Sequence, residues 1–253
     1  MCGRFVSASK PEKIAAYFGA DTQVETLGEN FNVAPTNDIY GVVAAPDGGL
    51  ELQVFHWGLV PVWAKDRKIG QQMINARAET IAEKPAFKGV FKKHRCIIPM
   101  DGFYEWAPGV EGGPVTKAGK LVKRPHFIHR LDGEPLAVAG IWSAWRDKAE
   151  AHDAPWLHSA AVVTTSANGT MAPIHDRMPV ILPKAMWGMW LDPTNHNIDV
   201  LSNLLVPAPD ALLEMHEVST DVNNVRNKGP HLIDRVGHRS AATRSTPQST
   251  RAL

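Results

Sequence analysis

The chain has 253 residues, 44% hydrophobic and 21% charged, a composition that predicts a globular protein with a full hydrophobic core and excludes a disordered chain. Its net charge is only +1, it has no apolar run long enough to span a bilayer and no signal-peptide pattern, so we expect a cytoplasmic protein. Cys2 and Cys96 lack CxxC spacing, so we expect neither disulfides nor a metal site.

The first feature along the chain is Cys2, which directly follows the initiator Met1. Removal of Met1 would place a free α-amine and a thiol on the same residue. The amine of such a pair can condense with an aldehyde, and the thiol can then close onto the imine. Both groups have ordinary pKa values of about 8 to 8.5, so both are partly nucleophilic near neutral pH. A small inert residue after Met1 is the alternative interpretation.

Short strands and few helices are predicted along the rest of the chain. Residues 11–18 suit a helix capped by Ser9, and residues 42–45 and 52–57 suit a hairpin around the PDGG turn. This pattern, with its scattered prolines and glycines, predicts a single α+β domain and argues against a doubly wound sheet. Further strands are expected at 95–99, 137–142, 160–165 and 179–182, and further helices at 78–84, 184–191 and 198–205.

The charge separates the chain into two parts. Residues 1–234 carry 23 Lys and Arg against 26 Asp and Glu, whereas residues 235–253 carry four arginines and no acid. The terminal part is rich in Ser, Thr and Ala and has no apolar periodicity. We therefore expect one domain over 1–234 and a disordered basic tail over 235–253 that attracts nucleic acid.

Several segments carry residues suited to chemistry. Asn75 and Arg77 would share one face of an extended segment, where an amide can orient a nucleophile and a guanidinium can hold a phosphate. Glu105 follows an apolar strand, which suits either a buried acid–base group or an exposed strand end. His175 and Arg177 would share a face of a second extended stretch, although an isolated histidine is often structural. Trp57, Trp63 and Trp106 are candidates for stacking with bases, although tryptophans are more often part of the core.

Nine motifs occur together in an order that resembles the SOS-response-associated peptidase family of abasic-site processing proteins. The resemblance covers Cys2 to about Ile233 and leaves out only the tail. It implies a β-barrel-like core of mostly antiparallel strands with flanking short helices. The motifs are MCGRF (1–5), FNVAPT (31–36), WGLVPVWAKD (57–66), NARAETIAEKPAFK (75–88), RCIIPMDGFYEW (95–106), AGIW (139–142), TTSAN (164–168), IHDRMPVIL (174–182) and VSTDVN (218–223).

The resemblance also implies a function and a set of site residues. It implies that a monomer, without a cofactor, captures abasic sites in single-stranded DNA as a covalent thiazolidine on Cys2. Release of Met1 or of the cross-linked peptide and a lyase side activity are further expectations. Asn75 would position the amine, and Glu105 and His175 would transfer protons. Arg4, Arg77 and Arg177 would hold phosphates, and Trp106 and Thr164 would lie near the DNA.

Two other classes of function remain open from the residues. A class II glutaminase also begins with Met-Cys-Gly, but its further histidine-threonine-arginine-tryptophan and Asn-Gly-Asp motifs are absent from this sequence. A reader of single-stranded or modified DNA would use the arginines and aromatics without forming a bond. A denaturing gel separates this reader from a cross-linking protein.

Overall fold

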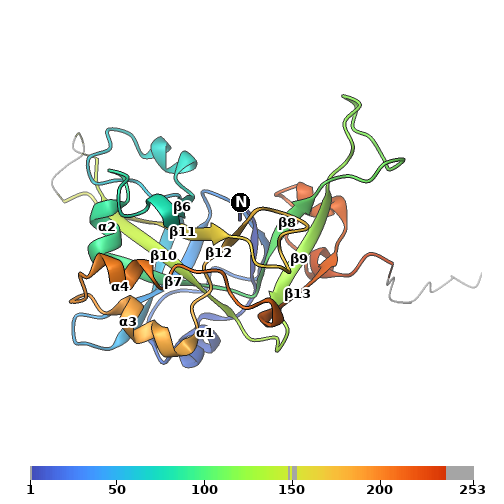
Figure 1. Cartoon of the computed structure of the whole chain (residues 1–253). Helices are drawn as coiled ribbons and strands as arrows, with labels where there is room; N and C mark the ends of the chain where they lie inside the picture. The colour runs from blue at the N-terminus through green and yellow to red at the C-terminus, as the bar shows by residue number, and fades with distance from the viewer. Residues whose placement is uncertain (1, 148, 150–152, 238–253) are drawn as a thin grey trace, which may run out of the picture.

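The fold is α+β, with two β-sheets and short helices packed against the larger one (Figure 1). The computed structural model describes residues 2–147, 149 and 153–237. The predicted fold class, including its barrel-like core, is confirmed. No helix among the described residues is both long and apolar enough to cross a membrane.

Five strands of the larger sheet close into a barrel. Strand β11 pairs with β10, β10 with β7, β7 with β4 and β4 with β5, all antiparallel. Strand β5 then pairs with β11 in parallel through Ser159–His56 and Ala160–Trp57, which closes the ring. Closure removes the open edges that single sheets expose. The strands are β4 (Asp38–Ala44), β5 (Leu50–Trp57), β7 (Arg95–Met100), β10 (Leu136–Trp145) and β11 (Leu157–Ser166).

Three short strands extend this sheet beyond the ring. Strand β6 (Asn75–Arg77) lies parallel to β11, and β12 (Arg177–Pro179) lies antiparallel to β11. Strand β2 (Asp21–Thr22) lies parallel to β5. The strand predicted over 179–182 therefore begins and ends earlier, while Ile181 makes only an isolated bridge to Val138.

The second sheet is fully antiparallel and has five strands in the order β13, β9, β8, β1, β3. In Figure 1 the N-terminus lies between this sheet and the β6, β11 and β12 side of the barrel. Cys2, the first described residue, packs with residues of both sheets. The strands are β1 (Phe5–Ser7), β3 (Asn30–Val33), β8 (Gly102–Ala107), β9 (Arg124–Arg130) and β13 (Leu213–Glu217).

The helices are short and lie near the predicted positions. Helix α1 (Pro11–Phe18) has the expected bounds, but Ser9 does not cap it because its hydroxyl donates to Asp101 at 2.7 Å. The segment expected as a helix over 78–84 contains only a 3-10 turn, η2 (Ala78–Thr80). The other helices are α2 (Lys88–Lys93), α3 (Trp187–Leu191) and α4 (Ile198–Ser202), with 3-10 turns η1 (Arg67–Gln72), η3 (Lys184–Met186), η4 (Asp210–Leu212), η5 (Thr220–Asn223) and η6 (Pro230–Ile233).

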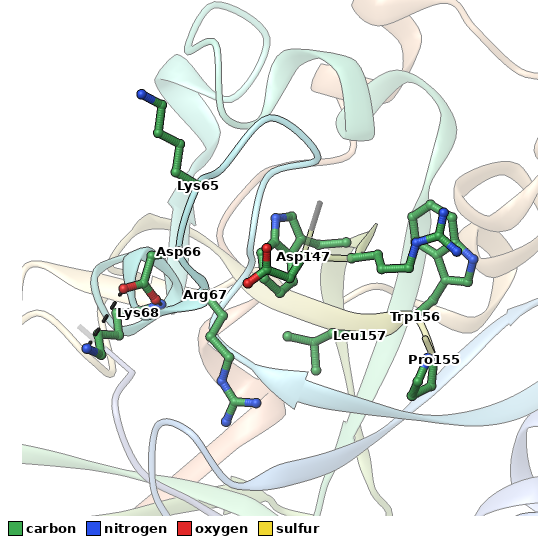
Figure 2. Close-up of a pocket in the computed structure, with 10 residues that line it drawn as sticks. Lys65, Asp66, Arg67, Lys68, Asp147, Pro155, Trp156 and Leu157 are labelled. Carbon is green, nitrogen blue, oxygen red and sulfur yellow. Dashed lines mark hydrogen bonds and ion pairs between the residues drawn. The ribbon is translucent and has the colours of Figure 1, made fainter. Parts of the chain in front are cut away.

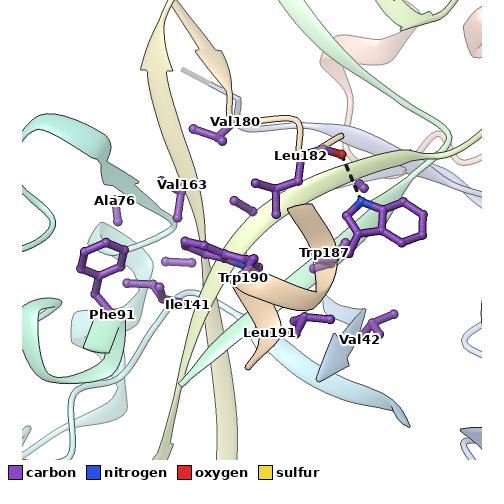
Figure 3. Close-up of a cluster of buried hydrophobic side chains, with 14 of the residues drawn as sticks. Val42, Ala76, Phe91, Ile141, Val163, Val180, Leu182, Trp187, Trp190 and Leu191 are labelled. Carbon is purple, nitrogen blue, oxygen red and sulfur yellow. Dashed lines mark hydrogen bonds between the residues drawn. The ribbon is translucent and has the colours of Figure 1, made fainter. Parts of the chain in front are cut away.

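Barrel strands β4, β7, β10 and β11 bury both of their faces, as their nearly continuous apolar runs indicate. Val42 and Val163 pack with the helical residues Trp187 and Trp190 in one cluster, which Figure 3 shows. The indole Nε1 of Trp187 donates to the Leu182 carbonyl at 3.1 Å, so its polar atom is satisfied. Alternate strand residues join a second cluster, between the barrel and the second sheet, that contains Cys2. The start of the chain is therefore part of the core.

The end of the described chain is tied to the second sheet. Arg235 forms a bridge with Val218, and the Val236 amide donates to the Glu217 carbonyl at 2.9 Å. Residues 238–253 lie outside the described residues. The predicted division into a domain over 1–234 and a basic tail over 235–253 stays a prediction.

Candidate active site

Cys2 is completely buried in the apolar cluster between the two sheets. Burial raises the pKa of its thiol above the ordinary value, and the nearby negative charge of Glu105 raises the pKa further. The thiol is therefore protonated near neutral pH in this environment. Any reaction in which its sulfur attacks needs a group that removes this proton.

The register of β6 on β11 places Asn75 and Arg77. Asn75 lies opposite Val162 and Arg77 opposite Thr164, so the two side chains share one face of β6, as predicted. The Asn75 amide Nδ2 donates to the Cys2 carbonyl at 2.9 Å. Its Oδ1 is buried and accepts no hydrogen bond from any described residue. This amide therefore holds the Cys2 backbone and keeps an acceptor available beside it.

Glu105 lies inside strand β8, not at its exposed end. The residue is only 3% exposed, which excludes the alternative of a solvated strand-end carboxylate. Strand β8 is held on one side by β1, since the Tyr104 amide donates to the Arg4 carbonyl at 2.9 Å. On the other side Glu105 pairs in register with His126 of β9. The sheet thus fixes a buried carboxylate close enough to Cys2 to influence its pKa.

His175 lies in the loop that leads into β12. Its Nδ1 accepts a hydrogen bond from the Arg177 backbone amide at 3.0 Å, which puts the proton of the neutral ring on Nε2. The same Nδ1 lies 2.9 Å from the Asp176 carboxylate. Met171 and Met178 on either side of His175 pack in the Cys2 cluster. The loop therefore brings an imidazole to the same region of the fold.

The Arg177 guanidinium is held by two residues in a fork-to-fork arrangement. Its Nη1 and Nη2 donate to the two carboxylate oxygens of Glu79 at 2.6 and 2.9 Å, and Nη2 also donates to the Thr164 carbonyl at 2.7 Å. Hydrogen bonding to Arg177 lowers the pKa of the Glu79 carboxyl. A carboxylate thus occupies the bidentate position in which a phosphate would bind an arginine.

Arg4 has a different environment on the second sheet. Its Nη1 donates to Asn32 Oδ1 and to the Val222 carbonyl, both at 2.9 Å, and the guanidinium lies 6.0 Å from the Trp106 ring centre. Both acceptors are neutral, so the positive charge of Arg4 is not cancelled by them. Lys228 donates to the Asn32 carbonyl at 2.9 Å and brings a second cation to this place.

The predicted site residues fall into a central group and an outer group. Cys2, Asn75 and Glu105 meet between the sheets, and the His175 loop packs on the same cluster. Arg77 is exposed at the end of β6, whereas Thr164 is fully buried and contacts Arg177. Trp57 is also fully buried and donates to the Ile74 carbonyl, so of the two alternatives it is a core residue and does not stack on bases.

Sequence reasoning missed two residues that hold the predicted arginines. Glu79 follows Arg77 by two residues in NARAET, and Asn32 lies in FNVAPT, so both belonged to motifs already singled out. Their partners are distant in the sequence and come close through the pairings of β11 with β6 and β12 and of β1 with β3. Among the described residues no group of three or more His, Cys, Asp or Glu side chains is arranged to hold a metal ion.

Comparisons with known proteins agree on one family. A family model described as "SOS response associated peptidase (SRAP)" matches residues 1–225. The abasic site processing protein YoaM of Bacillus subtilis is 39% identical over 242 residues, which cover 94% of this chain and 100% of YoaM. The abasic site processing protein YedK of Escherichia coli is 30% identical over 245 residues, which cover 93% of this chain and 100% of YedK.

A solved structure gives the same result for the fold. The crystal structure of a Bacteroides thetaiotaomicron protein superposes with a TM-score of 0.77 at 28% identity. The match covers 92% of this chain and 99% of that protein.

Proposed function

We propose, since this chain belongs to the SOS response associated peptidase (SRAP) family, that it processes abasic sites in DNA by capturing them covalently on Cys2. The observation that carries the proposal is the hydrogen bond from Asn75 to the Cys2 carbonyl beside the buried Glu105. This hydrogen bond holds the backbone of Cys2, which removal of Met1 would make the first residue. The substrate we propose is an abasic nucleotide in single-stranded DNA.

The first step is release of Met1 by hydrolysis. Water adds to the Met1 carbonyl carbon, and the bond from this carbon to the Cys2 nitrogen breaks. Methionine leaves with the new carboxylate, and Cys2 keeps a free α-amine. We propose that the chain itself can assist this step, because Asn75 already holds the Cys2 backbone.

The capture step joins the aminothiol to the aldehyde of the opened sugar. The Cys2 nitrogen attacks the C1′ carbon, and loss of water gives an imine. The Cys2 sulfur then attacks the same carbon while the thiol proton is transferred to the nitrogen, which closes a thiazolidine ring. The balance is one aldehyde and one aminothiol giving one thiazolidine and one water. An imine that does not close would permit β-elimination, which is the origin of the lyase side activity we expect.

The environment of Cys2 supports this order of attack. The raised pKa of the buried thiol keeps sulfur protonated, so the amine reacts first. Glu105 and His175 supply the proton transfers that sugar opening, water loss and ring closure need. The Asn75 side chain holds the Cys2 carbonyl throughout and orients the amine.

The arginines provide the binding surface for the strand. We propose that Arg77 and Arg177 bind the phosphates that flank the lesion, and that Arg4 with Trp106 lines the second-sheet side. Guanidinium groups suit this role because they bind phosphate oxygens in a bidentate manner. Thr164 is buried and contributes by holding Arg177.

The test begins with the intact mass of the purified protein, which must lack Met1. The protein is then incubated with a single-stranded oligonucleotide carrying one abasic site and run on a denaturing gel. We expect a heat-stable adduct from the wild type and none from Cys2→Ala. Cys96→Ala is the matched control, because it removes the other buried cysteine and should leave the adduct yield unchanged. A wild-type adduct yield in Cys2→Ala would refute the proposal.

A further inference from the structure

A basic cleft outside the site described above opens beside the start of β11. It has a volume of about 680 Å³ and lies between the loop Lys65–Lys68 and the neighbouring ends of β10 and β11. Figure 2 shows Asp147, Trp156 and Leu157 across from Arg67 in this cleft. None of its lining residues takes part in the function proposed above. Its composition indicates a ligand that is both anionic and aromatic.

An exposed tryptophan forms one wall of the cleft. Trp156 is 54% exposed, although a large apolar side chain normally gains from burial. The Arg146 guanidinium lies 4.7 Å from the centre of the Trp156 ring, a cation–π contact that orients the ring. An oriented ring with more than half of its surface open is suited to stacking with an unpaired nucleobase.

The cleft carries more positive than negative charge, and both of its acidic groups are already engaged. Asp66 accepts a hydrogen bond from the Lys68 amide at 2.8 Å, and Asp147 accepts one from the Ala149 amide at 2.9 Å. These carboxylates shape turns, and Asp66 also forms an ion pair with the Lys68 ammonium at 3.8 Å, so four cationic side chains of the lining stand against two carboxylates. The cationic side chains of the lining are Lys65, Arg67, Lys68 and Arg146. Such a group attracts the phosphates of a nucleic-acid strand.

Strand β11 connects the cleft to the candidate active site. Leu157 at the start of β11 lines the cleft, and Val162 on the same strand lies opposite Asn75. Five residues of strand span about 17 Å. This length corresponds to about five nucleotides at a stacked spacing of ~3.4 Å, and to fewer in a stretched strand. A DNA strand held at the site can therefore reach the cleft after a few nucleotides.

We infer that this cleft binds a single-stranded flank of the damaged strand, with one base stacked on Trp156 and a phosphate held by Arg67. This inference rests on the proposed function only in taking the bound strand to be the damaged one. An unpaired flank is favoured over a duplex, because a base must leave its stack to lie on an exposed indole ring.

The experiment measures reversible binding of fluorescent, undamaged single-stranded oligonucleotides, so its result does not depend on cross-linking. Two series place either a 5′ or a 3′ flank of two to eight nucleotides next to a fixed core. We expect the affinity of the wild type to rise once one of the two flanks reaches about five nucleotides. Trp156→Ala should lower the affinity for the long flanks by roughly five-fold or more, as expected for the loss of one stacked base. Arg67→Ala should lower the salt slope by about 0.7.

The controls separate the cleft from general charge and from misfolding. Lys184→Ala removes an exposed cation that also lies beside a tryptophan ring, 5.8 Å from the Trp187 centre, and should retain the full gain. Trp156→Phe keeps an aromatic face and should restore most of the gain lost in Trp156→Ala. Wild-type affinity of both Trp156→Ala and Arg67→Ala for the long flanks would overturn the inference. So would a gain that appears only when the flank is paired into a duplex.

Discussion

The two sides of the candidate site hold their arginines in different ways. On the barrel side, Arg177 is bound by the Glu79 carboxylate, so its charge is neutralised by a group that a phosphate can replace. On the second-sheet side, Arg4 is bound by the neutral oxygens of Asn32 and Val222. An arginine with an anionic partner can exchange it for another anion, whereas one with neutral partners keeps both its charge and its position. We therefore propose that the barrel side binds the strand exchangeably and that the second sheet supplies a fixed positive field.

The largest effect is expected from Glu105→Gln, which tests whether the second sheet also carries the chemistry. Loss of an acid–base group typically slows a reaction by about 10²-fold or more. We expect this loss in the single-turnover rate of adduct formation at saturating DNA, with reversible binding nearly unchanged. His175→Ala should behave in the same way. A wild-type rate in Glu105→Gln would show that another group transfers the proton.

The next effect separates the two arginines. Arg177→Ala should weaken binding of single-stranded DNA by roughly ten-fold or more, because a hydrogen-bonded charge contributes about 1.5–3 kcal/mol. Arg4→Ala should instead lower stability by about 1–3 kcal/mol, since it leaves the buried Asn32 without its donor. Titration by fluorescence anisotropy and thermal melting distinguish the two. Equal losses of affinity and of Tm in both variants would contradict the comparison.

A smaller effect, an increase in DNA affinity instead of a decrease, is expected from Glu79→Gln. If the carboxylate competes with phosphate for Arg177, its removal should tighten DNA binding a few-fold. If Glu79 only positions Arg177, the same variant should bind more weakly. Glu79→Asp is the control, because it keeps the charge and shortens the reach.

The pH dependence of this pair adds a second test. The pKa of Glu79 is lowered by Arg177, so the ion pair is complete above the ordinary glutamate pKa of about 4.3 and is lost as the pH falls through the lower folded value. The affinity difference between wild type and Glu79→Gln should therefore be constant from pH 6 to 8. It should shrink below about pH 4.5 if the protein remains folded.

The smallest effect is expected from the terminal residues. Arg235 is bridged to Val218, so the informative truncation follows Gly237 and removes Arg239, Arg244 and Arg251. Each arginine that contacts a phosphate of a single strand contributes about 0.7 to the salt slope. We expect the slope to fall by at most ~2 and the saturating rate to stay constant. A lower saturating rate would show that the domain extends past residue 237.

Local sequence patterns predicted the parts of the site that depend on one strand. The spacing of Asn75 and Arg77 was enough to place both on one face, because side chains alternate along a strand whatever its neighbours are. The burial of Glu105 could not be decided locally, since it depends on β1 and β9 covering β8 on both sides. Ser9 shows the same limit, because the distant Asp101 accepts its hydroxyl and leaves the helix uncapped by a side chain.

Contacts between segments that are far apart in the chain could not be predicted from the sequence. The Arg177 side chain comes from strand β12 and the Glu79 side chain from the 3-10 turn η2, and no local rule pairs them. The role of Trp57 in the core also follows from the barrel, which closes at Ala160 next to it. The family resemblance therefore supplied the set of candidate site residues, spacing placed Asn75 and Arg77 on one face, and the sheet pairings determined which residues meet.

The parallel pairing of β6 with β11 has a consequence for folding kinetics. Parallel neighbours are joined by long connections, and contacts between distant segments form late and slowly. Asn75 can reach the Cys2 carbonyl only after this pairing is in place. We therefore expect a refolding chain to regain its bulk secondary structure before it regains adduct formation. Ribosome-bound chains that end before β11 should be inactive, so the reactive terminus gains its activity only when synthesis of the barrel is complete.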